Sequence, residues 1–166
     1  MPLLPPTVIG PISVCNSSIR VQGQNIGATV DLFESGSSNP IGGGTATLSD
    51  QVFPLNSGLK LSAGQSITAT QSQNGETSPP SPAPVAVQSA TESIGTVACV
   101  SHIYQCGQAL SFTGAMPGAT VQVTAGGAMR GQAVSADGTA EVILSSPTQA
   151  SDTLIATQIA CGTIVP

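Results

Sequence analysis

Apolar residues alternate with polar residues in short runs along most of the chain. In "IRVQG" the apolar positions are Ile19 and Val21, and in "TVQVT" they are Val121 and Val123. A period of two puts one row of side chains on one face of an extended strand, so each run predicts a strand with one buried and one solvated face. Clusters of Gly, Asn, Asp, Ser and Pro between the runs predict turns. The pattern therefore predicts six or seven short strands in each half of the chain, as in an antiparallel β-sandwich.

One pattern occurs twice. The stretch "CNSSIRVQGQNIGATVDL" begins at Cys15, and "CGQALSFTGAMPGATVQV" begins at Cys106, an offset of 91 residues (106 minus 15). Both have Cys, two alternating apolar residues, Gly, and then Gly-Ala-Thr-Val. Further along, "ITATQ" (67–71) matches "LIATQ" (154–158) at an offset of 87. Matching motifs whose offset falls from 91 to 87 residues indicate a duplicated domain with a shortened loop in the second copy.

The most Pro-rich stretch, "GETSPPSPAPVAV", lies between the two copies. Proline cannot donate to a sheet ladder and favours an extended conformation, so this stretch predicts a semi-rigid connector or a strand-swapping edge. We therefore expect two domains, residues 1–92 and 93–166, with the Pro-rich connector near 79–84.

Charge is scarce in this chain. Only 7% of the residues are charged, and Lys60, Arg20 and Arg130 are the only Lys and Arg residues against eight Asp and Glu, for a net charge of −5. A nucleic-acid-binding protein needs a basic surface to displace counterions, so we exclude that class. No apolar run approaches the roughly 18 residues of a membrane helix, so we expect no membrane insertion.

The four cysteines are Cys15, Cys99, Cys106 and Cys161. An even count in a Lys-poor chain rich in Ser, Thr and Gly predicts disulfides and an oxidising compartment. Four cysteines allow three connectivities. The echo between "TVAC" (96–99) and "QIAC" (158–161) favours Cys15–Cys99 with Cys106–Cys161, and the second loop would stabilise its domain by roughly 4 kcal/mol.

Several turn motifs occur in a fixed order: "GATV" in both copies, "ADGTAEVIL" (136–144), and "LSAGQSITATQSQNGETSPPSP" (61–82). In that order they resemble the bacterial immunoglobulin-like (Big-type) repeats of large surface and adhesin proteins. The resemblance covers most of the first copy and residues 106–158 of the second. It departs at Ala140, where such repeats often have an aromatic residue, and in the cysteines, which many repeats lack. The resemblance implies an all-β chain of two tandem immunoglobulin-like antiparallel β-sandwich domains, and it implies no catalytic residues.

Metal and enzyme chemistry offer alternative interpretations of the same residues. "CVSHIYQC" spaces Cys99, His102 and Cys106 loosely like zinc ligands, and Cys161 could complete a site, but Cys15 would then have no role. His102 is the only histidine, and no neighbouring cation would lower the pKa of a cysteine thiol. Glu76 and Glu92 near the connector could bind calcium, although no Asp-x-Asp-x-Asp run exists. We expect disulfides, no metal, no cofactor and no enzyme.

The expected function is a non-catalytic structural or adhesive one, on the bacterial cell surface or in an extracellular fibre. Sandwich edges and low charge favour self-association or binding to other surface proteins. A carbohydrate-binding module is the first alternative; Tyr104, with His102 beside it in sequence, is the candidate binding surface for a glycan or another partner. A phage virion decoration or tail protein is the second alternative, and it would predict reduced cysteines because virions assemble in the cytosol.

Overall fold

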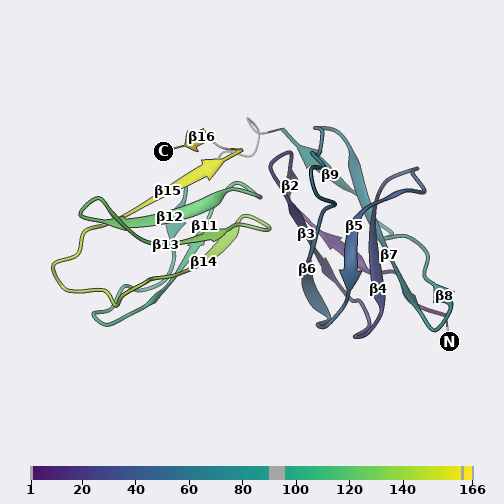
Figure 1. Ribbon diagram of the computed structural model, residues 1–166, viewed down its shortest axis with the longest axis horizontal. Helices are drawn as coiled ribbons and strands as arrows, with labels where there is room; N and C mark the ends of the chain where they lie inside the picture. Colours follow the sequence, from purple (N-terminus) through teal and green to yellow (C-terminus); the bar gives the residue numbers. More distant parts are fainter. Residues whose placement is uncertain (1, 90–95, 162, 166) are drawn as a thin grey trace. The chain divides into compact units, whose positions relative to one another are not determined.

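The computed structural model describes residues 2–89, 96–161 and 163–165, and the chain divides into two compact units, Met1–Ser89 and Ala90–Pro166. Every regular element in the described residues is a β-strand (Figure 1), so the expected all-β class is confirmed. No helix in this part of the chain is long and apolar enough to cross a membrane. Below we call the two parts unit 1 and unit 2.

Unit 1 has two sheets with its apolar core between them. The smaller sheet has the strand order β1-β3-β6, and the larger has the order β2-β9-β7-β4-β5, with β8 also paired to β7. Side chains from both sheets form one buried cluster. The strands are β1 (Thr7–Ile9), β2 (Ile12–Ser13), β3 (Ser18–Gln22), β4 (Thr29–Glu34), β5 (Pro40–Thr45), β6 (Asp50–Pro54), β7 (Ser66–Gln73), β8 (Glu76–Thr77) and β9 (Val85–Gln88).

Unit 2 is built in the same way. Its smaller sheet has the order β10-β11-β14, its larger sheet has the order β13-β12-β15-β16, and a second buried cluster lies between them. The strands are β10 (Ala98–Cys99), β11 (Ala109–Thr113), β12 (Thr120–Ala125), β13 (Ala128–Val134), β14 (Thr139–Ile143), β15 (Leu154–Ala160) and β16 (Thr163–Val165).

The alternating runs of the sequence form the inward and outward rows of these sheets. Ile19 and Val21 in β3 are fully buried, and their neighbours in the strand are only half-buried. Val121 and Val123 in β12 follow the same rule. Because successive side chains of a strand point to opposite faces, a period of two gives each sheet one apolar face, and two such faces enclose the core. The predicted alternation is therefore confirmed. Unit 2 has seven described strands, as expected, whereas unit 1 has nine, because β2 and β8 add two pieces of two residues each, and β2 pairs in parallel with β9.

The two units repeat the same strand register. β3 pairs with β6 as β11 pairs with β14, and β4 pairs with β7 as β12 pairs with β15. At the repeat offsets of 91 and 87, the pair Val30–Gln71 becomes Val121–Gln158. The sequence repeat is thus also a repeat of backbone pairing.

A buried glutamine explains the repeated "ATQ". Gln71 and Gln158 are each 1% exposed. The side-chain Oε1 of Gln71 accepts a hydrogen bond from the backbone N–H of Asn25 at 2.8 Å, and Oε1 of Gln158 accepts from Met116 at 2.9 Å. Asn25 and Met116 begin the turn that leads into Gly-Ala-Thr-Val in each copy. Each glutamine therefore holds the entry turn of one strand against the neighbouring strand, and it satisfies a donor that would otherwise have no acceptor.

A glycine marks the point where the two sheets come together. A Cβ on Gly42 in β5 would lie 2.4 Å from the carbonyl oxygen of Pro54, and a Cβ on Gly131 in β13 would lie 2.4 Å from that of Ile143. No side chain fits at that distance, so each unit needs glycine there for the close approach of two backbones. Gly42 is the first residue of "GGG", which the sequence shows only in the first copy.

The Pro-rich segment lies along the edge of β7. The Ser78 backbone N–H donates to the Gln71 carbonyl at 2.9 Å, and the Ser78 hydroxyl accepts from the Gln71 N–H at 3.0 Å. Ser81 makes the same two contacts with Ala69, at 2.9 and 3.0 Å. The serines thus supply the donors that the neighbouring prolines lack. The segment expected to connect two domains lies within unit 1, and the expected boundary between 92 and 93 falls outside the described residues.

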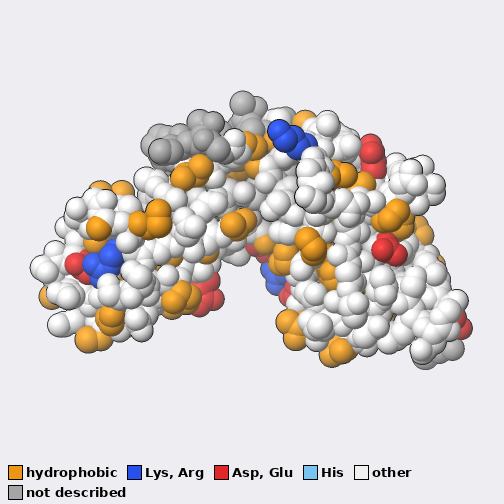
Figure 2. All heavy atoms as spheres, viewed as in Figure 1, with side chains coloured by type: hydrophobic (Ala, Val, Ile, Leu, Met, Phe, Trp, Pro, Cys, Tyr) orange, Lys and Arg blue, Asp and Glu red, His pale blue; other side chains and the backbone are white. Residues whose placement is uncertain are grey.

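The surface carries few ions, as the composition predicts. On the face shown in Figure 2, charged side chains are few and scattered among uncharged ones. The pair Arg20–Asp50 joins β3 to β6, with Nη2 and Oδ2 2.6 Å apart, and Gln22 also donates to Asp50. The hydrogen bond from Arg20 holds the pKa of Asp50 below its ordinary value. This carboxylate therefore braces two strands.

Replacing Gln158 with Met, or Gln71 with Met, should destabilise the chain by about 1–3 kcal/mol, because a turn N–H loses its acceptor. The midpoint of chemical denaturation measures the effect. Gln122→Met is the matched control, since Gln122 lies on the outer row of β12, and we expect it to change stability by less than about 0.5 kcal/mol. Equal losses in Gln158→Met and Gln122→Met would contradict the anchoring role of the glutamine.

Ser81→Ala should also destabilise the chain by about 1–3 kcal/mol, because the buried Ala69 N–H loses its acceptor. The same variant should speed hydrogen exchange at the Ala69 amide. Ser62→Ala, at an exposed serine, is the control and should leave both readouts unchanged. An Ala69 amide that exchanges at the same rate in Ser81→Ala and in the unmodified chain would show that the segment does not seal the strand edge.

Candidate functional site

Several side chains of types that are rare in this chain lie in residues 99–107 of unit 2, which we call the 99–107 segment. It contains the only histidine and the only tyrosine of the chain, and two of its four cysteines. It begins at Cys99 in β10, which pairs with Phe112 of β11. Val100, Ile103 and Tyr104 are 57%, 55% and 70% exposed. The segment therefore exposes three large side chains within five residues.

The rings of His102 and Tyr104 lie together. Their centroids are 6.1 Å apart and their planes make an angle of 22°, which is a stacked arrangement. The two residues that the sequence analysis named as a candidate binding surface are therefore adjacent in space. Stacked, exposed rings offer a flat face to a ligand, but their role in binding stays a prediction.

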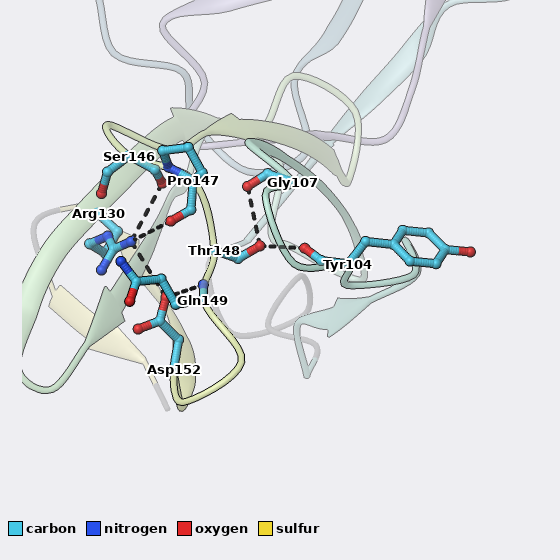
Figure 3. Close-up of polar contacts among 8 residues, drawn as sticks. All are labelled: Tyr104, Gly107, Arg130, Ser146, Pro147, Thr148, Gln149 and Asp152. Carbon is cyan, nitrogen blue, oxygen red and sulfur yellow. Dashed lines mark hydrogen bonds and ion pairs between the residues drawn. The ribbon is translucent and has the colours of Figure 1, made fainter.

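Thr148 holds the end of this segment in place (Figure 3). Its backbone carbonyl accepts from the Cys106 N–H at 2.8 Å, and its N–H donates to the Gly107 carbonyl at 2.9 Å. Its hydroxyl contacts the carbonyl oxygens of Tyr104 and Gly107. Thr148 itself is 3% exposed. One buried threonine thus contacts the backbone groups of Tyr104, Cys106 and Gly107, while the Tyr104 ring points away from it into solvent (Figure 3).

An arginine fixes the loop that carries Thr148 (Figure 3). Nη2 of Arg130, in β13, lies 3.1 Å from the carbonyl oxygen of Pro147 and 3.5 Å from Oδ2 of Asp152. The same Asp152 oxygen accepts from the Gln149 N–H at 2.9 Å. Both side chains of the ion pair are less than one-fifth exposed. The loop is therefore tied to the sheet on one side and to the 99–107 segment on the other.

Sequence reasoning did not single out Thr148 or the Arg130–Asp152 pair. One signal was available: Gln149 and Asp152 repeat the turn of Ser62 and Gln65, whose side chain accepts from the Ser62 N–H at 2.6 Å. That signal identifies a turn. It does not reveal the contact with the 99–107 segment, because that contact joins residues more than 40 positions apart.

The cysteines differ from the expected pairing. Cys15 and Cys161 are disulfide-bonded, whereas Cys99 and Cys106 are free, exposed thiols. Neither Cys15–Cys99 nor Cys106–Cys161 is formed. The reason lies in the echo between "TVAC" and "QIAC": the first lies in β10, the first strand of unit 2, and the second ends β15. The two motifs therefore occupy different positions in the fold, and their similarity did not predict which cysteines form a disulfide.

The alternative metal ligands are not assembled. In the described part of the chain, no group of three or more His, Cys, Asp or Glu side chains is arranged to hold a metal ion. That includes Cys99, His102 and Cys106, which the zinc hypothesis would bring together. Glu76 lies in β8, and Glu92 falls outside the described residues.

The other aromatic side chains divide between core and surface. Phe53 and Phe112 are buried in the cores of their units at 1% and 3% exposure. Phe33, in β4, is half-buried and lines a pocket of about 380 Å³ together with hydroxyl side chains, including Thr68 and Thr70 of β7. A sugar platform would have to use Phe33 or Tyr104.

No protein-family model matches the chain, and no curated protein matches it. Among solved structures it is similar to a biofilm associated protein, BSP domain, with 13% identity and a TM-score of 0.45, covering 96% of this chain and 27% of that one. It is also similar to the human OSCAR ligand-binding domain, with 14% identity and a TM-score of 0.40, covering 99% of this chain and 95% of that one. At these values neither likeness carries an argument about fold or function.

Thr148→Val keeps the shape of the side chain and removes its hydroxyl. We expect a loss of about 1 kcal/mol and faster hydrogen exchange at the Cys106 and Gly107 amides, because the turn loses its clamp. Thr124→Val, on the outer row of β12, is the control with the same chemical change and should alter neither readout. If both variants left these two amides equally protected, the hydroxyl of Thr148 would have no positioning role.

Proposed function

We propose that the chain is a non-catalytic structural or adhesive component of a bacterial cell surface or an extracellular fibre, built from two tandem immunoglobulin-like sandwich modules. One observation carries the proposal: the strand register, the buried glutamine and the glycine contact all recur in both units. What was duplicated is a set of packing and turn residues. A chain that repeats its scaffold, without repeating a cluster of reactive side chains, fits a spacer or stalk better than a catalyst.

The cysteines support a location outside the cytosol. Cys15 and Cys161 are disulfide-bonded, and structural disulfides persist in oxidising compartments. The same observation favours the surface role over a virion protein assembled in the cytosol, for which we expected reduced cysteines.

Proteins are the proposed partners, either further copies of the chain or other surface proteins. The 99–107 segment supports this, because its exposed apolar side chains are of the kind found at protein–protein contacts. We propose no cofactor. A carbohydrate-binding role is the second candidate, and the stacked pair His102–Tyr104 is the observation that favours it.

Antibody labelling of intact and permeabilised cells tests the proposed location. We expect labelling of intact cells at the same intensity as after permeabilisation, because the protein is accessible from outside. Labelling that appears only after permeabilisation would contradict the proposal. An abundant cytosolic protein, labelled in the same preparations, controls for cell integrity.

Two further measurements separate the alternatives. Alkylation of the unreduced chain followed by intact mass should add label at Cys99 and Cys106 alone; label at every cysteine would favour the virion protein. A glycan screen with Tyr104→Ala as control tests the second candidate. Saturable glycan binding that Tyr104→Ala abolishes would replace the structural proposal with a carbohydrate-binding one.

A further inference from the structure

A pocket of about 380 Å³ lies on the outer face of the larger sheet of unit 1. Phe33 of β4 is opposite Thr68 of the neighbouring strand β7 (Figure 1), and both residues line the pocket. The next pair in the register, Leu32 and Ala69, is fully buried in the core. Because successive side chains of a strand point to opposite faces, Phe33 and Thr68 belong to the outer row. The volume is within the range of about 300–1,000 Å³ found for small-ligand sites.

Hydrogen bonds fix the parts of the lining that lie outside the sheet. In the turn between β4 and β5, the Ser37 N–H donates to the Glu34 carbonyl at 2.9 Å, and the Ser35 N–H donates to the Ser66 carbonyl at 2.7 Å. Pro80 also lines the pocket, and the Pro-rich segment that carries it is tied to the β7 edge by its serines. The pocket is therefore formed before a ligand binds, which lowers the entropy cost of binding.

The lining contains hydroxyl side chains that have no hydrogen-bond partner among the described residues: Ser35, Ser38, Thr68 and Thr70. Thr68 is the most buried of them, at 7% exposure. Its hydroxyl can be satisfied only from the pocket, by water or by a ligand group that donates or accepts a hydrogen bond. The lining therefore combines one aromatic ring with several available hydroxyls.

Unit 2 shows that the scaffold does not need these side chains. At the repeat offsets, the pair Phe33–Thr68 becomes Thr124–Ile155, and both pairs have the same antiparallel register. β12 keeps the buried row of β4 without an aromatic residue at the matched position. Neither the ring of Phe33 nor the hydroxyl of Thr68 is thus required for the sheet to form, and both are available for binding.

We propose that this pocket binds one ring of a neutral oligosaccharide. A sugar ring has an apolar C–H face, which packs on Phe33, and hydroxyls that both donate and accept, which pair with Thr68 and the other free hydroxyls of the lining. None of the lining residues is charged. Asp31 is opposite Thr70 in the register, on the same face as Phe33, and its carboxylate disfavours anionic sugars.

The proposal goes beyond the surface role and does not depend on where the protein is located. It assigns sugar binding to unit 1 and not to the 99–107 segment, so it also differs from the carbohydrate-binding candidate above. Failure of the cell-labelling experiment would leave the pocket unaffected, and failure of sugar binding would leave the structural role unaffected.

Saturation-transfer NMR on the full chain tests the proposal with maltotriose, cellotriose, triacetylchitotriose and lactose as neutral probes. We expect saturable binding of at least one of them, with amide shift changes at residues 33–38 and 68–70. Sialyllactose is the matched acidic probe for lactose, and we expect it to bind more weakly than the neutral sugars, because it brings a carboxylate close to Asp31.

Variants of the chain locate the binding. Phe33→Leu keeps an apolar side chain and removes the ring, and Thr68→Val keeps the shape and removes the hydroxyl. Each should weaken binding of the tightest neutral probe at least about fivefold. Thr124→Val, at the repeat position of Phe33 in unit 2, is the control and should leave binding unchanged. Circular dichroism and the thermal midpoint verify that the variants are folded.

Three results would overturn the proposal. The first is no saturable binding of any neutral probe by the folded, unmodified chain, including the case in which a proline-rich peptide alone shifts residues 33–38. The second is sugar binding that neither Phe33→Leu nor Thr68→Val weakens. The third is sugar binding that Tyr104→Ala abolishes and Phe33→Leu preserves, which would place the sugar on the 99–107 segment.

Discussion

The outer edge of one long strand, β7 in unit 1 and β15 in unit 2, is the constraint on which both units depend. Backbone N–H and C=O groups at a strand edge must be paired or left to water, and an unpaired edge invites another strand. In unit 1, three segments form hydrogen bonds along the β7 edge in succession: β9, the two serines of the Pro-rich segment, and β8. The serines explain how a segment with so many prolines can run beside a strand of the sheet.

The candidate site includes the repeat position that β2 occupies in unit 1. In unit 1, β2 occupies the repeat position of residues 103–104, and its Ile12 lies under β9. In unit 2 the same stretch is held from the other side, by Thr148, and its apolar and aromatic side chains face solvent. A position that belongs to the core in one copy has become surface in the other. Among the described residues, the two copies therefore differ at this position in which side chains they expose.

The sequence predicted the strands that both copies share. It did not predict the contacts that hold the 99–107 segment or the disulfide. Alternation identified rows such as Val121 and Val123, because burial on one face is a local property of a strand. The repeated "ATQ" marked Gln71 and Gln158, although their bonds to a distant turn could not be deduced. The predicted disulfide pairing was wrong because the similarity of two short motifs does not show that they occupy equivalent strand positions. Thr148 was missed because its partners lie more than 40 residues away, and the serines because they act through the neighbouring strand.

Amide hydrogen exchange at one matched pair of residues tests the account most directly. Ala69 in β7 and Ala156 in β15 occupy the same repeat position, and Ala69 is sealed by Ser81. Residue-resolved exchange measured by NMR on the unmodified chain should show the Ala156 amide exchanging at least about tenfold faster than that of Ala69, a difference of about 1.4 kcal/mol in protection. Equal protection of the two amides would contradict the claim that Ser81 seals the Ala69 amide while no described strand pairs with this edge of β15 at Ala156.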